Sequence, residues 1–288
     1  MGAVFLREIQ SYFQALTGFI FLGLFLFFAG IIFTLSNLWP PGSSDFRTTL
    51  TFLNFIFLVA VPILTMRLLS EESRQKTDQL LLTSPISLTG IVLGKYLAAL
   101  ALFTVALAVT GMFPAFIGTA GLVVRSELVC SYLGVFLLGA SLISVGLFVS
   151  SLTDNQVSAA MLTFGAILLI WAIDWLIQAL PRDRGAGLAF LSLLAILAAV
   201  FVFMTTRNVW VALAVGASAL GGTALFWALR PAGFDGLIAH VLLWFSLVAR
   251  YGSFSRGVLA VGPVLYYVSF CATFVFLTVR VIDRRRWA

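Results

Sequence analysis

Long apolar runs separated by short polar breaks dominate the sequence. An α-helix needs about 20 apolar residues to cross a bilayer, and runs of that order recur along the chain. They predict eight membrane spans, at residues 19–38, 50–69, 96–116, 129–152, 159–177, 188–204, 209–229 and 258–279. The pattern therefore predicts an all-α polytopic membrane protein whose two ends lie on the same side.

The longest polar break covers residues 66–95, between the second and third predicted spans. It holds seven of the 28 charged residues (17 basic plus 11 acidic), so it must lie in water beside the membrane. Three leucines, Leu80–Leu82, follow the charges, and Ser84-Pro85 ends a helix because proline excludes the preceding residue from α geometry. We expect an amphipathic helix at residues 70–85 with one face offered to another protein.

The first 17 residues also carry a helical pattern. Apolar positions recur there at a spacing of three to four residues, which gives one apolar face. A helix lying in the membrane interface is favoured over a simple upstream extension of the first span. The positions are Val4, Phe5, Ile9, Phe13 and Leu16.

Two regions in the second half depart from plain spans. The runs at 188–204 and 209–229 are separated by only four residues, which predicts a tight membrane hairpin over 188–229. Residues 235–257 mix Asp235, His240, Arg250 and Arg256 with Leu, Trp and Phe, and no stretch there is clean enough to span. We expect amphipathic or re-entrant helices on the outer side.

Composition agrees with a membrane protein and narrows the function. Hydrophobic residues make up 61% and charged residues 10%, and the mean hydropathy is +1.11, whereas soluble domains carry roughly 25% charged residues. The net charge of +6 comes from a few loop residues, which indicates membrane orientation rather than nucleic-acid binding. The bias of Lys and Arg places both termini in the cytoplasm, although it is modest.

Candidate catalytic chemistry is scarce. The sequence has one histidine without ligands at metal spacing and no GxxxxGK[ST] phosphate loop. We therefore expect no enzyme activity, metal or cofactor in this chain, and ATP would have to bind another subunit. Asp174, flanked by Trp171 and Trp175, is the one carboxylate within an apolar run, and a boundary position is favoured over a proton relay. A secondary carrier is accordingly disfavoured.

The stretch "TMRLLSEESRQKTDQLLLTSPISLTGIVLGK" at residues 65–95 resembles the loop after the second span in permease subunits of ABC-2 type transporters. The gliding-motility and copper-processing permeases look most similar. Their ending is matched by Ser255-Arg256-Gly257-Val258, Tyr266-Tyr267 and Arg284-Arg285-Arg286-Trp287. The resemblance covers residues 6–177 and 237–287, and the typical six-span core would here carry an inserted hairpin at 188–229.

The resemblance implies an N-terminal elbow helix at residues 1–17 and a cytoplasmic coupling helix at 70–85 that docks on a separate ATPase subunit. Apolar leucines would anchor that contact and charges at its rim would set its register. By position, the residues expected to form or support the contact are Glu71, Glu72, Arg74, Thr77, Gln79, Leu80, Leu81 and Ser84.

The predicted function is that of a permease subunit in an ATP-driven exporter or membrane-remodelling complex in the bacterial inner membrane. Its expected partners are a cytoplasmic ATP-binding subunit, which would hold ATP and Mg²⁺, a second permease copy or paralogue, membrane lipid, and an extracytoplasmic accessory subunit. The alternative is a membrane anchor that transmits force without transporting. The sequence leaves the substrate, the direction of transport and homodimer versus heterodimer open.

Overall fold

The structure is a computed structural model that describes residues 2–38, 46–74, 87–118 and 125–287. It divides into two compact units, each of which is described by itself. The core unit comprises Met1–Leu169 and Arg250–Ala288, and the hairpin unit comprises Ile170–Ala249. The described residues are helical, with no strand among them.

The core unit begins with two consecutive helices that a single residue separates. Helix α1 (Gly2–Gln14) ends before Ala15, whose backbone is extended with φ −89° and ψ 148°, and α2 (Leu16–Phe33) follows. A π-helical turn, Thr34–Leu38, continues α2. A separate N-terminal helix therefore exists, while its position at a membrane interface remains a prediction.

The other core helices surround α8. They are α3 (Phe46–Thr65), α4 (Ser70–Arg74), α6 (Leu88–Thr110), α7 (Met112–Gly118), α8 (Arg125–Leu152), most of α9 (Gln156–Ala179) and α14 (Val261–Trp287). Within the span of α8, 78% of the residues are buried, against 11% in the span of α14. Helix α8 is therefore the inner helix of the unit, and α3, α6 and α14 pack against it.

Aromatic residues hold the interior together. The buried positions of α2 recur every four residues at Phe21, Phe25, Ala29 and Phe33, so they form one stripe along the helix. Phe25 meets Phe103 of α6 edge-on, with ring centroids 6.0 Å apart. The opposite face of α2 leaves large apolar side chains exposed, as expected where lipid rather than protein covers a helix.

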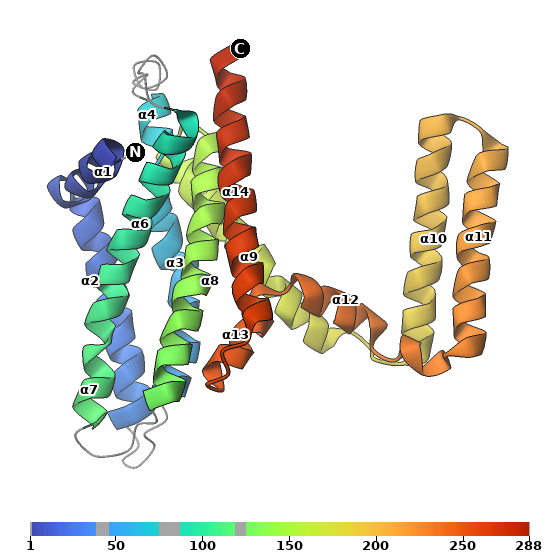
Figure 1. The fold of residues 1–288 in the computed structure, drawn as a ribbon, viewed down its shortest axis with the longest axis horizontal. Coiled ribbons are helices and arrows are strands. Elements are labelled where there is room, and N and C mark those ends of the chain that lie inside the picture. Colours follow the sequence, from blue (N-terminus) through green and yellow to red (C-terminus); the bar gives the residue numbers. More distant parts are fainter. Residues whose placement is uncertain (1, 39–45, 75–86, 119–124, 288) are drawn as a thin grey trace. The chain divides into compact units, whose positions relative to one another are not determined.

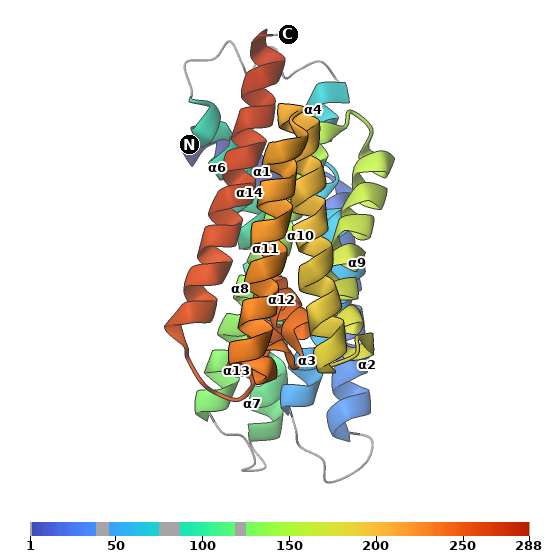
Figure 2. The ribbon, with the colours of Figure 1, turned by 90° about the vertical axis from the view of Figure 1, so that its right-hand side faces the viewer.

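Both termini of the core unit lie at the end where α4 lies, and α7 lies at the opposite end (Figures 1 and 2). Helix α14 runs parallel to α8, because Cys271 lies 3.5 Å from Ser141 and Phe274 lies 5.7 Å from Phe148 between ring centroids. The end of α14 is therefore at the α4 end of the unit.

The hairpin unit contains α10 (Arg184–Thr206) and α11 (Val209–Leu229), which pack side by side. Small residues allow the close approach, since a Cβ on Gly216 would lie 3.1 Å from the Cβ of Ala199. A short 3₁₀ turn (Pro231–Phe234) and α12 (Leu237–Phe245) follow. Helix α13 (Leu247–Ser255) turns from α12 by 82° and leads back to the core unit.

Among the described residues, eight helices are long and apolar enough to cross a membrane, which confirms the predicted spans. The bent pair α12–α13 passes the same test only when its two helices are taken together. The eight are Leu16–Asn37, Thr48–Arg74, Leu88–Ala115, Glu127–Leu152, Gln156–Ala179, Arg184–Thr206, Val209–Leu229 and Val261–Arg284.

Candidate functional site: a charged cluster at the α4 end

The polar break after α3 starts with a tight turn that is fastened to the end of α8. The Ser150 hydroxyl accepts hydrogen bonds from the backbone N–H groups of Leu69 and Ser70, at 3.1 and 3.2 Å. The Ser73 hydroxyl donates to the carboxylate of Asp154, which follows α8. Backbone groups that leave a helix need such partners when they are buried. The first residues of the break are therefore fixed on the inner helix of the unit.

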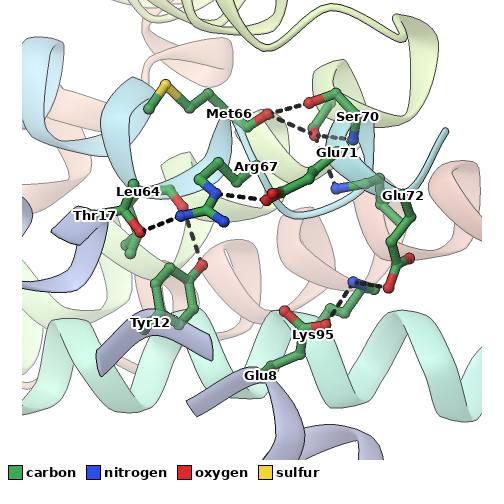
Figure 3. A network of polar contacts seen from close by, with 12 residues as sticks. Glu8, Tyr12, Thr17, Leu64, Met66, Arg67, Ser70, Glu71, Glu72 and Lys95 are labelled. Carbon is green, nitrogen blue, oxygen red and sulfur yellow. Dashed lines mark hydrogen bonds and ion pairs between the residues drawn. The ribbon is translucent and has the colours of Figure 1, made fainter. Parts of the chain in front are cut away.

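Lys95 is the centre of the cluster in Figure 3. It lies in the second turn of α6, and its side chain is 2% exposed. Its ammonium lies 2.7 Å from Glu8 of α1 and 3.0 Å from Glu72 of α4. A buried ammonium is very costly unless it is paired and hydrogen-bonded, so these two carboxylates are what make its position tolerable. Lys95 thereby joins three helices that are far apart in the sequence.

Arg67 forms a second junction beside the first. Its Nε donates to Glu71 at 2.6 Å, and its Nη1 donates to the hydroxyl of Thr17 at 2.9 Å. The pair with Glu71 has the i,i+4 spacing of neighbours on one helix face. Arg67 therefore ties the end of α3 to the start of α2.

Tyr12 completes the contact of α1 with α3. Its hydroxyl donates to the backbone carbonyl of Leu64 at 3.0 Å. Burial raises the pKa of Tyr12 far above its ordinary value, because the phenolate would lose its hydration. A cavity of about 20 Å³ beside it, lined by Glu8, Thr17 and Arg67 among others, has room for about one water molecule.

The cluster balances three cations against three anions: Arg7, Arg67 and Lys95 against Glu8, Glu71 and Glu72. Arg7 lies 3.8 Å from Glu72, and its side chain is 64% exposed. The arrangement offers fixed ion pairs rather than an activated nucleophile with its base. The cluster is therefore suited to a mechanical role and not to catalysis. Its ion pairs and hydrogen bonds fasten α1, α2, α4 and α6 to one another at the point where the chain enters residues 75–86.

The expected docking residues fall into three groups. Glu71 and Glu72 take part in ion pairs within the chain, and their side chains are 27% and 13% exposed. Arg74 is exposed at the end of α4. The others, Thr77, Gln79, Leu80, Leu81 and Ser84, lie outside the described residues, as does most of the predicted helix 70–85. A contact of these residues with an ATPase stays a prediction.

Sequence reasoning missed Glu8 and the cations that face the glutamates, which are Arg7, Arg67 and Lys95. It also missed Tyr12, whose hydroxyl donates to Leu64. One signal was present in the sequence. Lys95 directly precedes a long apolar run, and an ionisable side chain in such a position calls for a partner. The identity of that partner was not readable, because Glu8 is 87 residues away.

A second polar contact lies in the hairpin unit, at the bend between α12 and α13. The Ser246 hydroxyl donates to Asp174 of α9 at 2.6 Å and accepts from the backbone N–H of Ala249 at 2.8 Å. It therefore caps the first turn of α13 while it holds the bend against α9. Asp174 has a structural partner here, as befits a carboxylate within an apolar helix.

Among the described residues, eight membrane-length helices and a charged cluster on the break after the second span define a polytopic α-helical membrane protein. A comparison with protein families identifies the family to which this membrane protein belongs. The model of the family described as "ABC-2 family transporter protein" matches residues 8–182, and the chain belongs to that family. No curated protein matches the sequence.

The family match begins at Glu8, so it covers the residues of the charged cluster except Arg7, and it ends just before α10. It confirms the resemblance at the level of the family, so the chain is a multi-pass membrane permease of an ABC transporter. The gliding-motility and copper-processing subgroup remains a prediction. The α10–α11 hairpin and α14 lie beyond the matched residues.

Proposed function

We propose that this chain is the permease subunit of an ATP-driven ABC-2 exporter and that a separate ATPase subunit drives it through residues 70–85. The observation that carries the proposal is the cluster around Lys95. It fastens the elements on both sides of residues 75–86, α4 before them and α6 after them, to each other and to α1. Force applied to this segment would reach α1, α4 and α6 at once.

The division of labour follows from the sequence and the family. The chain has no phosphate-binding loop, and the permeases of ABC transporters work with ATP-binding subunits. ATP and Mg²⁺ would bind the partner, and closure of two ATPases would act on two copies of the permease or on a paralogous pair. An extracytoplasmic accessory subunit would be a further partner.

The proposed orientation puts the α4 end, with both termini, in the cytoplasm of a bacterial inner membrane. The path of the chain supports a re-entrant rather than a spanning α12–α13 pair. Helix α9 starts at the α4 end, and α14 starts at the other, where Gly257 lies against Glu127 of α8. If α9 crosses once, the chain between them crosses an even number of times. Helices α10 and α11 supply two crossings, which leaves none for the bent pair.

The test is a reconstituted complex of this chain with a candidate ATP-binding subunit. Leu81→Asp places a charge on the expected apolar anchor and should abolish both co-purification and stimulation of ATP hydrolysis by the permease. Leu81→Met keeps the volume and polarity, and it should leave both unchanged. Wild-type behaviour of Leu81→Asp would contradict the proposal.

The same complex separates transport from the alternative, a membrane anchor that passes on force. In sealed vesicles, a transporter moves substrate with ATP, and an anchor hydrolyses ATP without moving any candidate substrate.

A further inference from the structure

We infer that Lys95 is the pivot of a partner-exchange latch: Glu8 keeps its ammonium paired while Glu72 is released, so that α4 moves without leaving a buried charge alone. This inference rests on the proposed function and concerns how that function starts. Lys95 acts through its two carboxylates and is a positioning residue.

The buried ammonium of Lys95 has two carboxylates at nearly equal distance, 2.7 Å to Glu8 and 3.0 Å to Glu72. One partner is enough to satisfy a single positive charge. With one carboxylate, any movement of α4 would strand a buried cation, which is among the most costly changes a protein can undergo. With two, the ammonium stays paired at either end of the movement.

The helices that carry the two carboxylates differ in how firmly they are held. Glu8 lies on α1, a helix of 13 residues that Tyr12 also fastens to Leu64. Glu72 lies on α4, which has five residues and continues directly into residues 75–86. The short helix is the less firmly held of the two, so Glu72 is the group that is released and Glu8 is the group that stays.

A second cation lies near Glu72. The guanidinium of Arg7 lies 3.8 Å from the same Glu72 oxygen that faces Lys95. Arg7 is largely exposed on α1 and therefore able to follow, so a released Glu72 exchanges a buried cation for an exposed one. The fixed point of the movement is the turn at Leu69 and Ser70, whose N–H groups stay on Ser150. The exposed contact of Ser73 with Asp154 can exchange with water.

If the latch operates, two nearly isosteric substitutions should have opposite effects on the mobility of α4. Glu72→Gln removes the group that is released, so α4 should be loose from the start. Glu8→Gln removes the group that stays, so Lys95 depends on Glu72 and α4 should be locked. In a purely structural cluster each substitution only loosens the helix that loses its carboxylate and locks nothing, so a fall in ATPase stimulation with Glu8→Gln, and its recovery when Lys95 is also replaced, separate the latch from such a cluster.

The experiment measures distances between spin labels in the permease alone, in lipid nanodiscs, with Cys130 and Cys271 replaced by alanine. Labels at the exposed positions Arg74 and Thr89 report α4 against α6, and labels at Gln10 and Thr89 report α1 against α6. Glu72→Gln should broaden the first distance distribution and leave the second unchanged. Glu8→Gln should leave the first as narrow as in the wild type. Equal broadening of the first distribution in both variants overturns the latch.

A second measurement uses the complex with its ATPase and variants without labels. Glu8→Gln should lower permease-stimulated ATP hydrolysis at least fivefold, because α4 is locked. Adding Lys95→Met to Glu8→Gln removes the ammonium that holds Glu72, and it should recover part of the stimulation that Glu8→Gln loses, while the full wild-type level also needs the fastening that Lys95 supplies. A double variant that is as inactive as Glu8→Gln, or less active, overturns the latch.

The two hypotheses fail in different ways. If the wild-type permease does not stimulate any ATPase, the proposed function is wrong, and the label distances in the permease alone still test the latch. If stimulation is present and Glu8→Gln leaves it unchanged, the latch is wrong and the proposed function stands.

Discussion

Replacing Lys95 by methionine tests whether burial makes the cluster important for stability. The substitution keeps an unbranched side chain only one heavy atom shorter and removes its charge, so that the packing of the stem is largely preserved. It leaves Glu8 and Glu72, which are 14% and 13% exposed, around a site that has lost its cation. Both carboxylates then carry a desolvation cost, and no other cation in the cluster offsets that cost as fully as the Lys95 ammonium did.

The magnitude follows from the contacts. Removing one partner of a buried ion pair costs about 3–5 kcal/mol. The lower figure applies here, because both carboxylates keep some access to water and Glu72 keeps Arg7 at 3.8 Å. A loss of about 3 kcal/mol corresponds to a decrease of roughly 6 °C in the melting temperature of a protein of this size. The measurement is thermal unfolding of the purified permease in detergent, followed by tryptophan fluorescence.

The hairpin unit provides a control ion pair with the same nitrogen-to-oxygen distance as the pair of Lys95 with Glu72. Arg184 and Asp235 also form a pair at 3.0 Å, but their side chains are 53% and 47% exposed. Exposed pairs contribute about 0–1 kcal/mol, so Arg184→Met should lower the melting temperature by no more than about 2 °C. Equal shifts for Lys95→Met and Arg184→Met would refute the reasoning, because distance alone would then decide the energy.

Two further substitutions test the packing and the protonation of the core unit. Gly146→Ala should destabilise by about 1–3 kcal/mol, because its Cβ would overlap Thr65 of α3, whereas Gly165→Ala has nothing within 4 Å and should be neutral in the same unfolding assay. Tyr12→Phe should remove a pH dependence. The raised pKa of Tyr12 favours folding below about pH 10, the ordinary tyrosine value, and this contribution is lost as the pH rises above it. The melting temperature of the wild type should therefore decline more steeply between pH 9 and 11 than that of Tyr12→Phe, and parallel curves would contradict the assignment.

The spans were predictable because an apolar run of membrane length is seldom anything but a transmembrane helix. The first and last residues of the spans were less predictable. The third span was expected to begin at residue 96, after the last charge, but α6 begins at Leu88, where the Ser87 hydroxyl accepts from the N–H of Gly90 at 3.2 Å. The hydropathy pattern placed Lys95 outside the span, because hydropathy penalises a charged residue and takes no account of the carboxylates that pair with it. The carboxylates that neutralise Lys95 come from other helices, and only the fold brings them there.

The predicted docking residues begin in the break after α3, where the structure has the charged cluster, but the ion pairs within that cluster were not predicted, and docking of an ATPase there stays a prediction. Glutamates in a polar loop have the composition of a solvated rim, and the sequence suggested nothing else for Glu71 and Glu72. Their cations lie on α6 and in the turn that follows α3, and one of them, Arg67, precedes Glu71 by four residues. That local pair could have been found by spacing alone. The long-range pair of Glu72 with Lys95 could not.

The inner position of α8 explains why the cluster can act on the whole core unit. Glycines on α8 let its neighbours approach closely: a Cβ at Gly139 would lie 2.5 Å from Phe103 of α6, and Gly146 lies directly against Thr65 of α3. Close-packed helices move as bodies rather than deforming, because interiors have little free volume. Since Ser150 holds the turn before α4 on this same helix, a displacement of α4 has a rigid reference on α8. In the proposed latch, the ion pairs of Lys95 determine whether α1 and α6 follow that displacement or stay behind.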